Sequence, residues 1–243
     1  MKPENLPAID EAKRKAALAA VKHVKPNFIV GLGSGSTAAY AIEALAERIR
    51  RENLNIKGIP TSTQAFLFAV KHGIPITTLE EHPKIDVAID GVDQVDADLN
   101  LIKGMGGALA REKIVAAASR FNVIVADAGK RVRVLGEKDH PVPIEILPFA
   151  AKLVQHRIES LAGKPVLREA GKGKLGPVIT DNGNMIVDAF FGPISDAASL
   201  EKRLKAIPGV VETGLFIGLA DVVYVGSSHG VEKIEAKTKR SMN

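Results

Sequence analysis

The sequence predicts an α/β fold, in which helices cover both faces of a mostly parallel sheet and a small α+β unit is inserted later in the chain. Three observations predict it. Short apolar runs rich in β-branched residues alternate with helical patterns through the first half of the sequence. Glycines or aspartates follow several of these runs, as expected where parallel strands end at a ligand site. After residue 130 the pattern changes to segments punctuated by prolines.

The first half is expected to alternate strands and helices. The run Phe28-Ile29-Val30 is continuous and apolar, which is typical of a strand buried on both faces. Ile42, Leu45 and Ile49 recur at helical spacing and form one apolar stripe. The expected elements are a helix from an N-cap at Asp10 to just before Pro26, a strand over 28–30, a helix over 38–50, a strand over 56–59, a helix from Thr63 closed by Gly73, a strand over 85–89, a helix over 108–119 and a strand over 122–125.

The second half is expected to form the small α+β unit before the chain returns to the large sheet. The turn Asp181-Asn182-Gly183 separates two short apolar runs and predicts a strand pair. The expected elements are an amphipathic stretch over 149–161, the segment 165–167, strands over 178–180 and 185–188, a helix over 196–206, a strand over 210–213 and a strand over 222–225. We therefore assign residues 1–131 and 215–243 to a large domain and 132–214 to the small domain, with a frayed tail from Lys237 to Asn243.

The composition restricts the class of protein. Of the 243 residues, 46% are hydrophobic and 25% are charged, which is typical of a folded globular chain. No apolar run approaches the ~20 residues of a membrane span, and residues 1–10 lack the apolar core of a secretory signal. The chain has no cysteine, which excludes disulfides, thiol nucleophiles and the common structural zinc sites. We expect a cytoplasmic protein that binds no membrane.

The charge balance does not by itself identify a partner. Lysine and arginine number 33 against 28 aspartates and glutamates, so the net charge is +5. With no tryptophan, two tyrosines and no dense basic arm, the sequence does not favour nucleic-acid binding. A small phosphorylated ligand in a basic pocket fits a weak positive balance equally well. The six histidines show no metal-ligand spacing, so no metal site is expected.

The loop 31–37, with the sequence GLGSGST, is a candidate phosphate cradle. Glycines allow close approach of a ligand, while hydroxyl groups and the N–H groups of a following helix donate hydrogen bonds to phosphate. The loop is not a dinucleotide-binding fingerprint, because Ser36 stands where a glycine is needed, and it lacks the lysine of a P-loop. An ordinary strand-to-helix turn remains the alternative.

Two carboxylates in Asp90-Gly91-Val92-Asp93 follow the expected strand over 85–89. If they face one cavity, repulsion between them favours a proton on one, and that group becomes a usable proton donor. An Asx-type turn is an equally good interpretation. Calcium binding is disfavoured, since the spacing of the acids is not that of an EF-hand loop.

A third cluster contains Lys103, a glycine-rich loop over 104–107, and Glu112 near the start of the next helix. A lysine beside such a loop can neutralise negative charge that develops on an oxygen atom. Glu112 can act as a base over the same loop, or can be an ordinary first-turn glutamate stabilised by the helix dipole. Lys130 follows another strand end and is either a phosphate ligand or a solvated lysine.

Taken in this order, the clusters resemble the A-type ribose-5-phosphate isomerase family. The segment 31–37 is similar to that family's Gly-x-Gly-[Ser/Thr]-Gly-Ser-Thr loop, 90–93 to its Asp-Gly-x-Asp motif, 103–112 to its Lys-Gly-x-Gly…Arg-Glu-Lys motif, and 127–130 to its Ala-Asp-x-x-Lys motif. Each motif is weak alone, but four in the family's order make coincidence improbable. The resemblance implies a Rossmann-like catalytic domain with a ferredoxin-like insert, a homodimer or homotetramer, and no cofactor or metal.

The resemblance also implies an activity, the interconversion of ribose 5-phosphate and ribulose 5-phosphate in the non-oxidative pentose phosphate pathway. Glu112 is then the base that moves a proton between C2 and C1 through an enediolate. Asp90 and Asp93 assist ring opening and proton handling, and Lys103 stabilises the enediolate oxygen. The residues expected to bind substrate are Lys13, Ser34, Gly35, Ser36, Thr37, Gly91, Val92, Gly104, Met105, Gly106 and Lys130.

The sequence departs from the family pattern in three places. Met105 replaces a frequent glycine, Gln94 a frequent glutamate, and Ser34 a frequent threonine. Met105 is the one expected to narrow access to the backbone. Two alternatives stay open at this point: an enzyme of the related coenzyme A transferase group, which can use a glutamate nucleophile, and a non-catalytic module that binds sugar phosphates.

Overall fold

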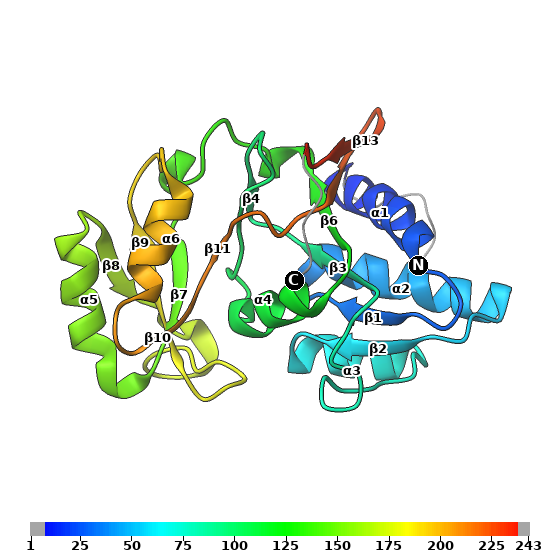
Figure 1. Cartoon of the computed structure of the whole chain (residues 1–243), viewed down its shortest axis with the longest axis horizontal. Coiled ribbons are helices and arrows are strands. Elements are labelled where there is room, and N and C mark those ends of the chain that lie inside the picture. Colours follow the sequence, from blue (N-terminus) through cyan, green and yellow to red (C-terminus); the bar gives the residue numbers. More distant parts are fainter. Residues whose placement is uncertain (1–7, 238–243) are drawn as a thin grey trace. The chain divides into compact units, whose positions relative to one another are not determined.

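The computed structural model of the protein describes residues 8–237 (Figure 1). Residues 1–7 of the N-terminal segment without a secretory signal, and residues 238–243 of the tail that is expected to be frayed, lie outside the described residues. Within this range the first unit comprises residues 8–92, 111–131 and 218–237, and the second unit comprises 93–110 and 132–217. The division into 1–131 with 215–243 and 132–214 stays a prediction.

The first unit is built on a six-stranded sheet with the order β13-β12-β6-β3-β1-β2. The strands are β1 (Ile29–Leu32), β2 (Lys57–Pro60), β3 (Val87–Gly91), β6 (Asn122–Asp127), β12 (Val222–Ser227) and β13 (Gly230–Glu235). Five of them run parallel, and only the edge strand β13 pairs antiparallel. Every residue of β3 and β6 is buried, as expected for strands covered on both faces. The predicted parallel sheet is confirmed.

Helices pack on both faces of this sheet. They are α1 (Ala8–Ala20), followed by the 3-10 turn η2 (Val21–His23), then α2 (Gly35–Glu52), α3 (Thr63–Lys71) and α4 (Leu109–Ala118), with η3 (Ala128–Lys130) after β6. Residues of α1, α2 and α3 share one apolar cluster with Val30, Leu32 and Val87. On the opposite face, Val115 of α4 packs against Ala88. Each fully buried valine or isoleucine contributes about 1.5–3 kcal/mol relative to exposure.

Three local expectations about the first unit are wrong in detail. Asp10 is not an N-cap, because α1 already includes Ala8; its carboxylate pairs instead with Lys13, one turn on, at 3.6 Å. The helix expected from Ala38 starts at Gly35, because the extended backbone of Ser34 ends the turn early. Asp90 belongs to β3 itself, since the pairing of β3 with β6 continues to Gly91.

The second unit contains two antiparallel sheets and two main helices. Its four-stranded sheet has the order β10-β7-β9-β8, and its three-stranded sheet the order β11-β5-β4. The elements are β4 (Gln94–Val95), β5 (Leu101–Ile102), η4 (Glu137–Asp139), β7 (Val142–Ile146), η5 (Pro148–Ala150), α5 (Ala151–Ser160), β8 (Lys164–Leu167), η6 (Gly171–Gly173), β9 (Met185–Phe190), α6 (Ala197–Lys205), β10 (Val210–Thr213) and β11 (Leu215–Phe216). Ile144, Val154 and Leu204 are fully buried in one core. The ferredoxin-like assignment of this unit stays a prediction.

The strand expected over 178–180 does not form. Ile179 makes one isolated bridge to Met185, and a buried carboxylate organises the rest of the loop. Oε1 of Glu145 in β7 accepts hydrogen bonds from the side chains of Thr180, Asn182 and Asn184 at 3.0, 2.9 and 2.8 Å. These side-chain bonds replace a regular ladder, which a pattern of apolar residues does not reveal.

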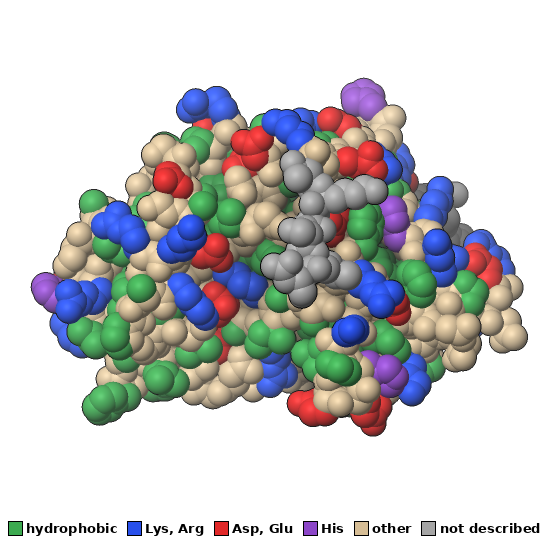
Figure 2. Space-filling view, viewed as in Figure 1, with side chains coloured by type: hydrophobic (Ala, Val, Ile, Leu, Met, Phe, Trp, Pro, Cys, Tyr) green, Lys and Arg blue, Asp and Glu red, His purple; other side chains and the backbone are tan. Residues whose placement is uncertain are grey.

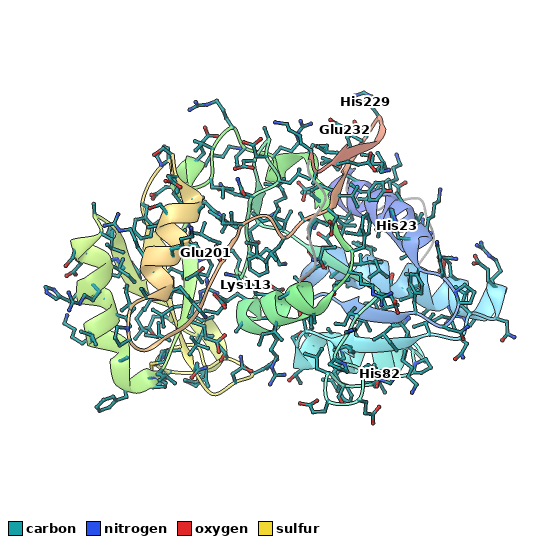
Figure 3. All side chains as sticks on the ribbon, in the orientation of Figure 1. His23, His82, Lys113, Glu201, His229 and Glu232 are labelled. Atoms are coloured by element: carbon teal, nitrogen blue, oxygen red, sulfur yellow. The ribbon has the colours of Figure 1, made fainter. Side chains whose placement is uncertain are left out.

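The surface of the protein carries both signs of charge. On the face drawn in Figure 2, lysine and arginine side chains are interspersed with aspartate and glutamate side chains. One exposed pair, Arg131 with Glu232, lies at 2.7 Å, and Glu232 is labelled on β13 in Figure 3. Among residues 8–237, no helix has the length and apolar character that a membrane span requires.

His23 closes the helical segment that begins with α1 and packs against the sheet (Figure 3). Its Nε2 lies 2.9 Å from the Tyr224 hydroxyl of β12, and its ring centroid lies 5.1 Å from that of Phe121. Burial lowers the pKa of His23 below 6.5, and the positive charge of Lys233 lowers it further, against an opposing effect of Glu235. The neutral ring is therefore the form that the fold accommodates.

We predict that His23 makes the stability of the protein sensitive to mild acid. Because its pKa is lower in the folded chain, the unfolded chain binds the proton more readily. Its contribution is therefore complete above about pH 6.5 and is lost as the pH falls, with a slope of at most about 1.4 kcal/mol per pH unit. Denaturant unfolding between pH 7.5 and 5 should show a shallower slope for His23→Gln than for the natural protein. His156→Gln on the exposed face of α5 is the control, and equal slopes for all three proteins would contradict the prediction.

Candidate active site

The carboxylate of Asp90 lies against the turn that connects β1 to α2. Its Oδ1 accepts hydrogen bonds from the backbone N–H groups of Ser34 at 3.2 Å and Gly91 at 2.7 Å. A Cβ atom on Gly33 would lie 2.2 Å from this oxygen, so only glycine allows the turn to approach so closely. The side chain of Asp90 is buried, with 8% of the residue exposed. This contact places one predicted catalytic carboxylate beside the predicted phosphate loop.

The hydroxyl of Ser34 connects the same turn to the next strand-to-helix connection. Ser34 Oγ lies 2.7 Å from Thr61 Oγ1 and 2.6 Å from Ser62 Oγ. Ser62 in turn caps α3 by accepting from the N–H of Ala65 at 3.0 Å. The N–H of Gly35 donates to Gln64 Oε1 at 3.0 Å. Thr61, Ser62 and Gln64 belong to no recognisable motif, so the sequence alone does not predict their place beside this turn.

The first turn of α2 carries the hydroxyl groups expected to bind phosphate. Ser36 is exposed and Thr37 is buried. Lys13 of α1 donates to Ser36 Oγ at 3.3 Å, so a cation and a hydroxyl that are far apart in sequence lie side by side. The N-terminal end of a helix favours negative charge, and a neighbouring lysine strengthens that preference. Gly91 faces this turn, since a Cβ there would lie 3.8 Å from Thr37 Cβ.

Glu112 lies in the first turn of α4, and Figure 3 labels its neighbour Lys113 on this helix. Only 6% of Glu112 is exposed. Burial of a carboxylate is costly, and the helix N-terminus is one of the places where the charged form is stabilised. Glu112 therefore has the shielded setting that a base acting on a carbon-bound proton requires.

Lys130 ends η3, directly after β6. Asp127, the last residue of β6, is buried, and its Oδ1 accepts from the N–H of Gly129 at 2.9 Å. This bond fixes the turn that carries Lys130, which is half-buried. The predicted position of Lys130 just past a strand end is confirmed.

The other predicted residues belong to the second unit. Lys103 follows β5 and is buried, with 3% exposed. Its Nζ lies 5.6 Å from the ring centroid of Phe216, a geometry in which the aromatic face attracts the cation. Its backbone N–H donates to the carbonyl of Gly214 at 2.9 Å. A buried ammonium held in this way is suited to act on a developing negative charge.

The glycine-rich loop after Lys103 is bonded to the second carboxylate of the Asp-Gly-x-Asp motif. The N–H of Met105 donates to Asp93 Oδ2 at 3.0 Å. Gly104 has a φ of 106°, which favours glycine, and the N–H of Gly107 returns to its carbonyl at 3.0 Å. Met105 and Gly106 are exposed, and Val92, just before Asp93, is buried.

The structure therefore brings the predicted residues together in two sets. In the first unit, Asp90 contacts Ser34, Thr37 lies beside Gly91, and Lys13 contacts Ser36. In the second unit, Asp93 contacts Met105 in the loop that begins at Lys103. Among residues 8–237, no cluster of three or more histidine or acidic residues is arranged to hold a metal ion.

The fold is that of an α/β protein, and the first set of residues lies at the carboxyl ends of the parallel strands of the first unit. The family model of ribose 5-phosphate isomerase A (phosphoriboisomerase A) matches residues 57–230. The chain is 48% identical to the ribose-5-phosphate isomerase A of Methanosarcina acetivorans, over 93% of this chain and 95% of that protein. It is 45% identical to the human ribose-5-phosphate isomerase, over 97% of this chain and 76% of that protein.

Solved structures agree. A D-ribose-5-phosphate isomerase in complex with phospho-erythronic acid is 46% identical, with a TM-score of 0.90, over 93% of this chain and 99% of that chain. Ribose 5-phosphate isomerase A from Methanocaldococcus jannaschii gives a TM-score of 0.89 at 45% identity, over 93% and 99%. The chain belongs to the ribose 5-phosphate isomerase A family, and the resemblance found in its motifs is confirmed.

We predict that Gly33→Ala displaces the Asp90 carboxylate. The new Cβ would overlap Asp90 Oδ1, so the turn must shift, and overpacking of this kind costs about 1–3 kcal/mol. Denaturant unfolding should show that loss, together with a fall in activity. Gly173→Ala is the matched control, because a Cβ at Gly173 meets nothing within 4 Å. A Gly33→Ala protein as stable and active as this control would show that the close approach is unnecessary.

Proposed function

We infer that this chain is an aldose–ketose isomerase that interconverts D-ribose 5-phosphate and D-ribulose 5-phosphate. The observation that carries the inference is its similarity, along almost the whole chain, to a D-ribose-5-phosphate isomerase solved with phospho-erythronic acid. That ligand has a phosphate at one end and a planar carboxylate at the other, so it resembles an enediolate attached to a sugar phosphate. A phosphorylated pentose is therefore the proposed substrate of this chain, within the non-oxidative pentose phosphate pathway.

Glu112 is the proposed base. Isomerisation removes a proton from C2 of the open-chain aldose, where the neighbouring carbonyl makes it acidic, and returns a proton to C1. One carboxylate can perform both transfers, as a glutamate does in triosephosphate isomerase. Support comes from the burial of Glu112 in the first turn of α4, which limits exchange of the proton with water.

Lys103 is the proposed electrophile. Removal of the C2 proton leaves negative charge on the carbonyl oxygen, and a buried ammonium stabilises that charge more strongly than a solvated one. Support comes from its 3% exposure and its place at the start of the glycine-rich loop. In the same loop, Gly104, Met105 and Gly106 are the proposed backbone contacts to the sugar.

Asp90 and Asp93 are the proposed groups for ring opening and for proton transfer at the hydroxyls. Ribose 5-phosphate is mostly a ring in solution, so the anomeric hydroxyl must lose a proton and the ring oxygen must gain one. Two carboxylates three positions apart in sequence can share these tasks. Gly91 and Val92 between them are the proposed lining of the site. Support comes from two hydrogen bonds: Asp90 accepts from the N–H of Ser34 in the turn before α2, and Asp93 accepts from the N–H of Met105.

The phosphate is proposed to bind at the start of α2. Support comes from the hydrogen bond between Lys13 and Ser36 and from the N-terminal position of Ser36 and Thr37 in the helix. Ser34 and Gly35 complete this turn, and Lys130 is the second proposed cation. Binding energy from the phosphate then orients the distant reacting carbons. We also propose a cytoplasmic homodimer or homotetramer that needs no cofactor, metal or nucleic acid.

We predict that Glu112→Gln loses turnover rather than affinity. Glutamine keeps the size of the side chain but cannot accept the proton, so kcat should fall about 10²-fold or more, while KM stays within several-fold. The assay follows the appearance of ketose from ribose 5-phosphate. Glu47→Gln on the exposed side of α2 is the matched control.

The same assay separates the alternatives. An unimpaired Glu112→Gln protein would remove Glu112 from the mechanism. A natural chain that binds ribose 5-phosphate without forming ketose would be a sugar-phosphate-binding module. If the chain does not convert pentose phosphates but transfers coenzyme A between an acyl-CoA and a carboxylate, it would be a coenzyme A transferase.

We predict that Asp90→Asn impairs the cyclic substrate more than the open-chain aldehyde. Asparagine retains an Oδ1 acceptor for the N–H of Ser34, so the turn should keep its shape, but it cannot take the anomeric proton. The measurement compares kcat/KM for ring and open-chain forms under single-turnover conditions, with the natural protein as reference. Equal losses for the two forms would contradict the assigned role.

A further inference from the structure

Arg168, directly after β8, connects two parts of the second unit that are distant in sequence. Its Nε donates to Asp188 Oδ2 at 2.8 Å, and its Nη2 donates to the other oxygen of Asp188 on β9. Its Nη1 donates to the carbonyls of Gly104 at 2.9 Å and Met105 at 3.0 Å. The side chains of Arg168 and Asp188 are each only 13% exposed. One guanidinium thus joins a carboxylate on the sheet to two successive carbonyls of the glycine-rich loop.

The geometry of this contact requires arginine. A guanidinium is planar and presents donors on two sides, so one side can bind a carboxylate while another binds the loop carbonyls. A lysine ammonium is a single point and cannot span both. Asp188 binds the side of the guanidinium that does not face the loop. The hydrogen bonds on the other side therefore fix the Gly104 and Met105 carbonyls relative to β9.

The remaining bonds of the loop depend on that orientation. A peptide carbonyl and the following N–H point in opposite directions across a planar unit. With the carbonyl of Gly104 turned toward Arg168, the N–H of Met105 points away and donates to Asp93 Oδ2. The same peptide therefore connects Arg168 on one side to a proposed catalytic carboxylate on the other. Lys103 precedes this peptide by one residue.

The side chain of Met105 takes part in the contact. Its sulfur lies 3.8 Å from Nη2 of Arg168, although 44% of Met105 is exposed. The thioether sulfur is a weak acceptor, so this side chain adds one further contact to the guanidinium.

We propose that Arg168 is a positioning residue of the isomerase reaction, which acts through the Gly104–Met105 peptide to hold Asp93 and Lys103 in working geometry. It is not proposed to touch the substrate. The inference rests on the roles proposed above for Lys103 and Asp93. A displacement of about 1 Å in a catalytic group can cost up to 10²-fold in rate, so a residue with this position has a measurable effect.

The test uses two variants of Arg168 and one control in the full chain. Arg168→Met removes the hydrogen-bond donors of the guanidinium and keeps an unbranched side chain. Arg168→Lys keeps the positive charge beside Asp188 but cannot bind the carboxylate and the loop carbonyls at the same time. Lys205→Met is the control. Lys205 also forms an ion pair within this unit, at 2.8 Å from Glu212, but it contacts β10 rather than the glycine-rich loop. Each protein is assayed for kcat and KM, for its melting temperature, and for hydrogen exchange of the segment 101–109 without ligand.

The expected result is a loss confined to turnover and to the loop. Both Arg168 variants should lower kcat by roughly 10- to 100-fold with KM within about three-fold, because the lost geometry matters most in the transition state. The 101–109 segment should exchange faster in both. Arg168→Lys should recover most of the melting temperature but not the turnover. Lys205→Met should keep the kcat and the exchange rate of the natural protein.

Two results would overturn the proposal. One is natural kcat in Arg168→Met; the other is recovery of both turnover and loop protection in Arg168→Lys, which would show that only the charge matters. If Arg168→Met does not fold, Arg168→Lys decides alone. If the natural protein and Lys205→Met form no ketose, the proposed function fails, while the exchange rates still report whether Arg168 holds the loop.

Discussion

The close approach of Gly33 to the carboxylate of Asp90 is the constraint on which the candidate site depends. A parallel sheet places the ends of β1 and β3 next to each other, but any side chain at Gly33 would fill the space that Asp90 Oδ1 occupies. Because Gly33 has no side chain, the Asp90 carboxylate can occupy this space, where it accepts a hydrogen bond from the N–H of Ser34 and fixes the turn before α2. One missing methyl group therefore determines both where a proposed catalytic acid lies and how the helix that is proposed to receive the phosphate begins.

Most of the first unit could be predicted from the sequence, because a strand buried on both faces has an unmistakable pattern. The runs at β1, β3, β6 and β12 are continuous and apolar, and the helices between them carry one apolar stripe. The errors fall at element ends, where the pattern is silent: the turn before α2 is shorter than expected. The strand expected over 178–180 does not form, for a different reason. Three polar side chains donate hydrogen bonds to the buried Glu145 carboxylate, and the periodicity of apolar residues does not reveal such contacts.

The candidate site was predictable only in part. Residues carried by short motifs, such as Asp90, Lys103 and Glu112, could be selected because spacing and residue type limit their chemistry. Their partners could not. Thr61 contacts Ser34 across 27 positions, and Arg168 contacts Met105 across 63, so these contacts exist only once the chain has folded. Supporting residues of this kind carry no motif because their position, and not their reactivity, is what the site uses.

The most direct measurement is a crystal structure of this chain with a phosphorylated four-carbon sugar acid bound. We expect a carboxylate oxygen of Glu112 within hydrogen-bond reach of the end of the ligand that mimics the enediolate, with Lys103 Nζ beside an oxygen of that end. We expect the phosphate to bind Ser36 and Thr37 at the start of α2. A ligand bound with its phosphate elsewhere, or with Glu112 turned away from it in every copy, would contradict the proposed site.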